Sequence, residues 1–326
     1  METEIINNYQ NYECSIDNIK DTLQKYGVAV VPNILNDEEI ENMRKGMWDT
    51  VEYLTSQLET PLDRNKTITW DAWFQLLPMH DMLLQTFSIG HSQFVWDIRQ
   101  NPKIANVFSK IWDCPIMDLN SSFDALSFHL PPEITGKGWY QNNDWLHVDS
   151  SFLRSDFECV QSFVTGYDIN DGDASLTILE GSNNYHKECG DKFEITNLHD
   201  WNILTQDQID FYLSKGCKRK TVKAPAGSMI LWDSRTVHCG TEPVIKRKEP
   251  NFRLVTYMCM TPKSFANESL LQQKIDAFEN MFMTSHCPHR PRKFPKRKRG
   301  FKLNVPELPK PELTDLGRSL VGYNLN

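Results

Sequence analysis

A histidine and an aspartate stand two positions apart in the stretch NNDWLHVDSSF, which covers residues 143–153. In an extended strand, residues i and i+2 project from the same face, so the His147 imidazole and the Asp149 carboxylate would lie side by side. Such a pair can hold a metal ion, although strands often carry both residue types on a polar surface. The metal-binding interpretation therefore needs a third ligand from another part of the chain.

His238 is the candidate third ligand. It follows the apolar run MILW and a short polar loop in GSMILWDSRTVHCG, residues 227–240. Two imidazoles and one carboxylate form the facial triad of non-haem Fe(II) oxygenases, which leaves coordination positions open. Zinc prefers a closed four-ligand site or three ligands with water, so a zinc hydrolase on these residues is the weaker alternative. His147, Asp149 and His238 are therefore candidate Fe(II) ligands at a catalytic centre.

Arg253 lies at the start of the apolar run FRLVTYMCM, downstream of His238. A guanidinium can form a two-pronged, charge-assisted pair with a carboxylate, so Arg253 could bind a dicarboxylate co-substrate beside the metal. The alternative interpretation is an ordinary salt bridge at the protein surface.

The segments that must position these residues change character along the chain. Residues 15–60 predict helix, strand and helix, because SIDNIKDTLQKYG has apolar residues at helical spacing and ends in a glycine suited to a C-cap. The next helix would be capped by Asn36 or Asp37. From about residue 120, short runs of Val, Ile, Leu, Phe and Tyr alternate with turn residues, which indicates a sandwich or barrel. The predicted fold class is α+β, with the helical N-terminal third packed on one sheet.

Length and composition predict an ordinary globular protein. The chain has 326 residues, 40% apolar and 24% charged, with a formal net charge of −8, which does not suit a chain built throughout to coat nucleic acid. No apolar run approaches the ~20 residues of a membrane span. The N-terminus lacks the basic and apolar regions of a signal peptide, and the eight cysteines include no CxxC pair. We expect a cytoplasmic protein with reduced thiols that is not secreted.

The chain from residue 285 onward is basic and rich in proline. Eight lysines and arginines and no acidic residue lie between 287 and 302. A solvated tail is the simplest interpretation, but PKRKR could serve as a nuclear address. The segment 290–302 could also attract nucleic acid or a phosphate-bearing substrate. The following LTDLGRSLVGYNLN is typical of a short amphipathic helix that docks on the domain.

Together, these motifs resemble the phytanoyl-CoA dioxygenase-like (PhyH) family of Fe(II)- and 2-oxoglutarate-dependent oxygenases. YGVAVVPNILNDEEI is similar to the family's N-terminal opening, WLHVDS to its His-x-Asp strand, and GDASLTILEGSNNYH to its following strand and turn. GSMILWDSRTVHCG is similar to the distal-histidine strand, and FRLVTYM to the strand with the 2-oxoglutarate arginine. The resemblance implies a double-stranded β-helix, a jelly-roll or cupin-like barrel with helices packed outside.

The resemblance also implies the cofactors and the organisation of the chain. Fe(II), 2-oxoglutarate and dioxygen are the expected cofactors, with Arg253 gripping the distal carboxylate of 2-oxoglutarate with the help of Thr241. We expect a single oxygenase domain at 1–284, made of a helical part at 15–115 and a jelly-roll core at 120–262. The basic tail at 285–326 would end in the short helix.

Other residues near these motifs have less specific interpretations. Gln161, on the next expected strand, would face either 2-oxoglutarate or solvent. Trp145 and Trp232 flank the metal-bearing segments and are expected to pack in the barrel, and His186 is expected to be structural. The remaining histidines show no ligand spacing and are interpreted as ordinary surface or core residues: His80, His91, His129, His199, His286 and His289.

The implied reaction couples oxidative decarboxylation of 2-oxoglutarate, to succinate and CO2, with hydroxylation of a small-molecule or acyl-CoA-type substrate. Asp149 favours hydroxylation over halogenation, because related halogenases have a small residue at this position. The alternative is a catalytically silent jelly-roll protein that binds nucleic acid or a partner through its basic tail. The complete His-Asp-His-Arg set favours the enzyme, since a silent relative would be free to lose one member.

Overall fold

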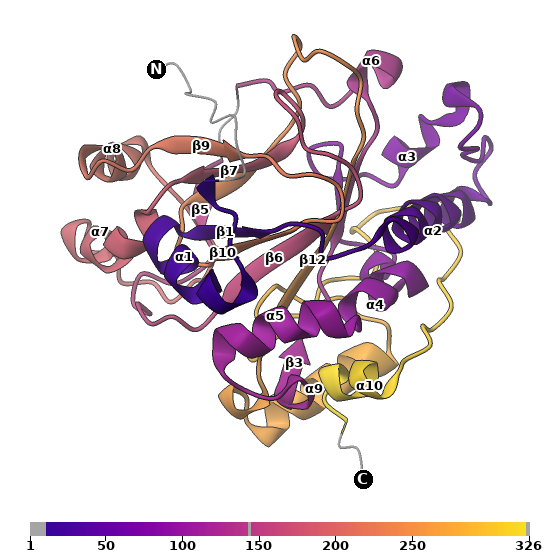
Figure 1. Ribbon diagram of the computed structural model, residues 1–326. Helices are drawn as coiled ribbons and strands as arrows, with labels where there is room; N and C mark the ends of the chain where they lie inside the picture. The colour runs from indigo at the N-terminus through magenta and orange to yellow at the C-terminus, as the bar shows by residue number, and fades with distance from the viewer. Residues whose placement is uncertain (1–10, 143–144, 324–326) are drawn as a thin grey trace.

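The computed structural model describes residues 11–142 and 145–323. Two antiparallel sheets face each other, and helices cover the outer side of the larger one (Figure 1). The seven-stranded large sheet has the order β1–β10–β6–β12–β4–β2, with β3 paired to β12, and the five-stranded small sheet has the order β8–β5–β11–β7–β9. This architecture confirms the predicted α+β double-stranded β-helix with outer helices.

The strands of the large sheet are β1 (Val28–Val31), β2 (Leu83–Leu84), β3 (Leu119–Ser121), β4 (Leu126–His129), β6 (Val160–Thr165), β10 (Met229–Asp233) and β12 (Arg253–Pro262). Those of the small sheet are β5 (His147–Val148), β7 (Ser175–Leu179), β8 (Asn202–Ile203), β9 (Arg219–Val222) and β11 (His238–Thr241). The helices are α1 (Ile19–Tyr26), α2 (Asp37–Thr55), α3 (Ala72–Gln75), α4 (Gln93–Arg99), α5 (Pro102–Trp112), α6 (Pro132–Thr135), α7 (His186–Lys192), α8 (Gln206–Ser214), α9 (Glu268–Glu279) and α10 (Asp315–Val321).

The N-terminal helices begin and end where local chemistry favours it. Helix α1 ends at Gly27, which adopts a left-handed conformation with φ of 76° and confirms the predicted C-cap. A side chain at this position would also collide with the Thr236 hydroxyl. Helix α2 begins after Asn36, whose side chain accepts from the Glu39 amide while the Glu39 side chain accepts from the Asn36 amide. Asn36 is therefore the cap, and not Asp37.

The central strands of the large sheet are buried on both faces, with side chains alternating between two cores. On β10, Met229 and Leu231 pack with the N-terminal helices, whereas Ile230 and Trp232 point between the sheets. On β6, Phe163 likewise points between the sheets. Because the side chains of a strand alternate with a period of two, Gln161 points the same way as Phe163. The polar residues of this inner face therefore open onto the space between the sheets.

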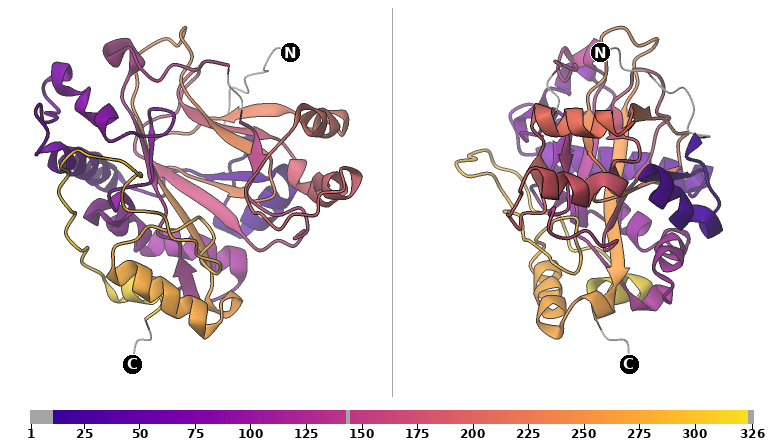
Figure 2. Two further views of the ribbon diagram at one scale, coloured as in Figure 1. Left: turned by 180° about the vertical axis from the view of Figure 1, so that it is seen from behind. Right: turned by 90° about the vertical axis from the view of Figure 1, so that its left-hand side faces the viewer.

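The segment 285–326 contributes to the main core in its described part. Val305 is buried, and Leu316 and Leu320 of α10 pack into the core that also contains the outer face of β10. The chain after α9 passes beside α2, where the Tyr53 hydroxyl donates to the Glu307 carbonyl, before it returns to α10 (Figures 1 and 2). The boundary expected at residue 284 stays a prediction. Among the described residues, the helices include none long and apolar enough to span a membrane.

Candidate active site

The three predicted metal ligands meet where the inner strands β5 and β11 of the small sheet pair. His147 on β5 and His238 on β11 are directly opposite in the antiparallel register, so their side chains project from the same face. Asp149 follows the end of β5, and its Oδ2 lies 3.7 Å from His147 Nε2 and 3.4 Å from His238 Nε2. One ligand atom from each residue falls within 4.8 Å of the others, a spacing that could hold a metal ion.

Both histidines are fixed in the same way. His147 Nδ1 donates to the Trp145 carbonyl at 3.0 Å, and His238 Nδ1 donates to the Thr236 carbonyl at 2.9 Å. Since a carbonyl can only accept, each Nδ1 carries the hydrogen and each Nε2 keeps a lone pair. Both lone pairs belong to the nitrogen atoms nearest Asp149, which is the arrangement that metal-binding histidines need.

Stacked rings hold His147 in place. The Trp145 ring stacks on the His147 imidazole with centroids 4.7 Å apart, and the His80 ring stacks on the opposite face of the indole at 4.8 Å. The indole Nε1 donates to the Gly240 carbonyl on β11. Trp145 therefore packs in the barrel, and its ring supports the orientation of His147.

Asp149 is held as an acceptor by its surroundings. Its amide donates to the Ser234 carbonyl at 3.0 Å, and Gln161 Nε2 donates to its Oδ2 at 2.9 Å. Burial would raise the pKa of the Asp149 carboxyl, but the nearby imidazoles of His286 and His147, and that of His238, keep it well below the ordinary value. The carboxylate is therefore ionised at neutral pH, and Gln161 contacts this ligand rather than solvent.

His238 stays neutral and has one competing donor. Burial and the neighbouring His147 imidazole lower its pKa, although the Asp149 carboxylate acts in the opposite direction. The Trp232 indole Nε1 donates to His238 Nε2 at 3.1 Å. Trp232 packs on Phe163 between the sheets, as expected for barrel packing, but it also contacts the nitrogen that a metal would need.

Arg253 lies inside the barrel and not at the surface. Its side chain is buried, and its guanidinium lies 5.1 Å from the centroid of the Phe163 ring, two positions along β6 from Gln161. Nη1 donates to the Ala174 carbonyl at 3.0 Å and Nη2 approaches the Tyr257 hydroxyl at 3.4 Å. Within the described residues, no carboxylate pairs with Arg253 and its buried Nε has no partner. A buried cation without a counter-charge fits an anionic ligand.

Thr241 is placed at the end of β11, and its hydroxyl bonds to that of Thr177 on β7 at 2.7 Å. Its predicted role beside 2-oxoglutarate stays a prediction.

Two further groups near Asp149 could not be predicted from the sequence. His286 and Asp124 come from segments far away in the chain, yet both lie within electrostatic range of the Asp149 carboxylate. Neither has a spacing that ties it to the His-x-Asp strand. The only local signal was the density of reactive residues in HCPHR, residues 286–290.

Comparison with known proteins identifies the family. The family model for Phytanoyl-CoA dioxygenase (PhyH) matches residues 23–243, a range that contains all three candidate ligands and Gln161 but not Arg253. The chain is 25% identical to Ava biosynthesis cluster protein O of Aspergillus versicolor over 280 residues, which cover 83% of this chain and 86% of that protein.

Solved structures show a similar fold. The hypothetical protein JW0805 from Escherichia coli superimposes with a TM-score of 0.62 at 14% identity, covering 96% of this chain and 85% of that one. HygX from Streptomyces hygroscopicus, solved with nickel and 2-oxoglutarate, gives a TM-score of 0.46 at 13% identity over 76% of this chain and 86% of that one.

The family match and the site agree with each other. Two imidazoles and a carboxylate with open coordination positions suit Fe(II), and an unpaired buried guanidinium suits the dicarboxylate co-substrate expected from the resemblance. The resemblance drawn from the sequence motifs is confirmed by the matched range: the chain belongs to the Phytanoyl-CoA dioxygenase (PhyH) family.

Proposed function

We propose that this protein is an Fe(II)- and 2-oxoglutarate-dependent dioxygenase that hydroxylates a small organic molecule and releases succinate and CO2. The observation that carries the proposal is the convergence of two Nε2 lone pairs and one ionised carboxylate, each fixed by a hydrogen bond from or to the surrounding chain. When bound, the metal and its co-substrate supply the oxidising chemistry that uses dioxygen.

The residues of the chain orient and isolate the reacting groups. His147, Asp149 and His238 would hold the metal, and a site with three protein ligands would leave coordination positions for co-substrate and dioxygen. Arg253 would bind the carboxylate of 2-oxoglutarate that does not reach the metal, with Tyr257 beside it. The two ligand histidines are buried and the Asp149 side chain is only 10% exposed, which would keep bulk water from the reacting centre.

Hydroxylation is the favoured outcome because Asp149 is present as a third protein ligand. A small-molecule substrate is supported by the matched relative, a protein of a biosynthesis cluster. An acyl-CoA thioester, as in the name of the family, is the other substrate class. A product one oxygen atom heavier than its substrate would identify hydroxylation, whereas an isomer or a product lacking two hydrogens would indicate another oxidation.

The test is succinate formation by the wild-type protein loaded with Fe(II), in the presence of 2-oxoglutarate and ascorbate. We expect slow turnover without substrate, inhibition by N-oxalylglycine, and no turnover by Asp149→Ala. Wild-type protein that binds Fe(II) but forms no succinate with or without candidate substrates would favour the catalytically silent alternative. Zinc in the isolated protein, with no inhibition by N-oxalylglycine, would favour a hydrolase.

The role of Arg253 has a separate test. We expect Arg253→Ala to raise the 2-oxoglutarate concentration needed for half-maximal succinate formation on the order of 10- to 100-fold, because a charge-assisted pair contributes about 1.5–3 kcal/mol. Metal affinity should change less than about twofold, since the guanidinium touches no ligand. An unchanged 2-oxoglutarate requirement would mean that another cation binds the co-substrate.

A further inference from the structure

A loop near the C-terminus closes against the candidate active site. Residues 284–293 form this loop, and its base is fixed by an antiparallel bridge between Thr284 and Lys293 and by the Ser285 amide, which donates to the Arg292 carbonyl at 2.8 Å. Thr284 also pairs with Phe123, donating its amide to the Phe123 carbonyl at 2.9 Å and accepting from the Phe123 amide at 3.0 Å. This pairing puts the loop next to Asp124.

The far side of the loop packs against chain segments close to Gln161. Cys287 is buried in a cluster with Cys159 and Cys259. Cys259 is the register partner of Gln161, which donates to Asp149. His286, between Thr284 and Cys287, therefore belongs to a segment that lies close to both Asp124 and the Asp149 carboxylate, and it acts electrostatically on both.

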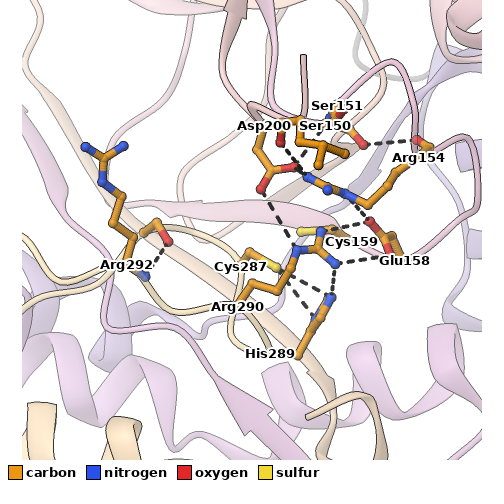
Figure 3. A network of polar contacts seen from close by, with 12 residues as sticks. Ser150, Ser151, Arg154, Glu158, Cys159, Asp200, Cys287, His289, Arg290 and Arg292 are labelled. Carbon is orange, nitrogen blue, oxygen red and sulfur yellow. Dashed lines mark hydrogen bonds and ion pairs between the residues drawn. The ribbon is translucent and has the colours of Figure 1, made fainter. Parts of the chain in front are cut away.

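Ion pairs anchor the loop to the segment that follows Asp149. Arg290 Nη2 lies 2.7 Å from Glu158 Oε1 and its Nε lies 3.9 Å from Asp200 Oδ2, and Arg154 pairs with the same two carboxylates. Figure 3 shows Arg290 between Glu158 and Asp200, with Cys287 beside Cys159. Two arginines alternate with two acids, so the loop is held in place by a closed set of opposite charges.

His286 and Asp124 keep hydrogen-bonding capacity that the described chain does not use. Both residues are partly exposed. Asp124 Oδ1 accepts from the Ala125 amide at 2.7 Å, while its second oxygen has no hydrogen-bond partner among the described residues. The His286 ring nitrogens likewise make no hydrogen bond within the described ranges, and the ring lies within electrostatic range of both Asp124 and Asp149.

We propose that the loop 284–293 forms one wall of the substrate cavity, and that His286 and Asp124 together bind a hydroxyl or amide group of the substrate beside the metal centre. This inference rests on the proposed function and adds a substrate class to it. A neutral imidazole offers one donor and one acceptor, and a carboxylate offers acceptors only. The pair therefore suits a group that both donates and accepts, and it disfavours an apolar analogue that would leave both side chains unpaired.

The test measures binding of small probes, without turnover. Wild-type protein is loaded with Mn(II) and N-oxalylglycine, and metal-induced broadening of probe proton signals is followed by NMR. Benzyl alcohol and benzamide are the polar probes, and toluene is the apolar one. We expect the polar probes to bind wild type with about tenfold higher affinity than toluene.

Matched variants assign the effect to His286. We expect His286→Ala to weaken the polar probes about tenfold and to leave toluene unchanged, and His286→Gln to restore part of the affinity because an amide keeps a donor and an acceptor. Asp124→Asn tests the second group, and Arg299→Ala, an exposed position in the same basic segment, is the control that should match wild type. Equal polar-probe affinity in wild type and His286→Ala would overturn the inference, and so would a wild-type protein without preference for polar probes.

Failure of the metal site would be seen separately. Electron paramagnetic resonance first establishes whether Mn(II) binds to the wild type and not to Asp149→Ala. If Mn(II) does not bind, the proposed function fails, and the same probe affinities are then measured by saturation-transfer NMR without metal. A preference for polar probes that depends on His286 would support the cavity wall even then.

Discussion

At the scale of single residues, the site is defined by which nitrogen of each histidine is free. His147 and His238 each donate Nδ1–H to the carbonyl of the residue two positions earlier, so the same local geometry is used on two different strands. The orientation of each ring is therefore set within its own segment. The local geometry does not determine which group contacts Nε2. On His238, the Trp232 indole makes this contact.

Trp232 should compete with the metal. Its N–H donates to the lone pair that a metal ion would take, so this hydrogen bond must break on metal binding. We expect Trp232→Phe to bind Co(II) up to about fivefold more tightly, because a hydrogen bond of about 1 kcal/mol is no longer lost. Titration of the Co(II) absorption spectrum measures this.

Trp145→Phe is the matched control for that titration. Its N–H donates to the Gly240 carbonyl and to no ligand nitrogen, so its removal should not tighten metal binding. Weaker Co(II) binding by Trp232→Phe would mean that the indole supports the bound metal instead of competing with it.

At the scale of elements, strand β6 connects the two cores of the molecule. Its inner face carries Gln161 toward Asp149, and its outer face carries Ser162, whose hydroxyl donates to the Met258 carbonyl on the neighbouring strand. Because side chains alternate between the two faces of a strand, Gln161 contacts the candidate site, whereas Ser162 contacts the neighbouring strand of the sheet.

Gln161→Leu should weaken the metal site without unfolding the protein. The variant removes the amide that donates to Asp149 Oδ2 at 2.9 Å, and loss of such a supporting contact lowers metal affinity on the order of 10-fold. Isothermal titration with Mn(II) measures the change. Ser162→Ala on the opposite face should keep wild-type metal affinity, and an equal effect of both variants would indicate general damage to β6.

The loop 284–293 should depend on its charge network. Arg290→Ala removes the cation shared by Glu158 and Asp200, and we expect faster amide hydrogen exchange in the loop with a loss of about 1 kcal/mol in the free energy of unfolding.

Arg292→Ala is the control for that loss, because the Arg292 guanidinium makes no hydrogen bond or ion pair with the described residues and extends away from the network in Figure 3. Equal exchange rates in the two variants would contradict a role for Arg290 in holding the loop.

At the scale of the whole molecule, buried histidines tie stability to pH. His91 is fully buried, donates Nε2–H to the Phe282 carbonyl at 3.0 Å and accepts from the Trp96 indole at 3.2 Å. Burial lowers its pKa to about 3, only partly offset by the Phe282 hydrogen bond, and the Arg99 charge lowers it further. The His91 ring thus joins the segment after α9 to the N-terminal helices in its neutral form.

This predicts a loss of stability as the pH falls. The unfolded chain protonates His91 near its ordinary value of about 6.5, whereas the folded chain does not protonate it until about pH 3. The contribution of neutral His91 to the free energy of unfolding is therefore complete above pH 6.5 and declines below it. The decline amounts to about 2 kcal/mol between pH 7.5 and 5.0. Urea unfolding should show that His91→Gln loses about 2 kcal/mol less than wild type over this interval. Identical losses would mean that the His91 ring is already protonated in the folded protein.

The sequence by itself determined the features that depend on short-range geometry. The spacing of His147 and Asp149 places them on one face of an extended segment, the glycine after Tyr26 ends α1, and the ordered motifs identify the family. These features follow from backbone periodicity and local hydrogen bonding, which depend on residues close together in the sequence. The predicted roles of Arg253 and Thr241 at 2-oxoglutarate stay predictions.

Only the tertiary structure decided which distant residues meet. Three features join segments separated by long stretches of chain: the register that sets His147 opposite His238, the contact of Gln161 with Asp149, and the electrostatic influence of His286 on that carboxylate. A lone histidine in a basic, proline-rich segment has no periodicity that points to its partner. Its place is set by the burial of Cys287 and by the charges around Arg290, which act only once the sheets have packed.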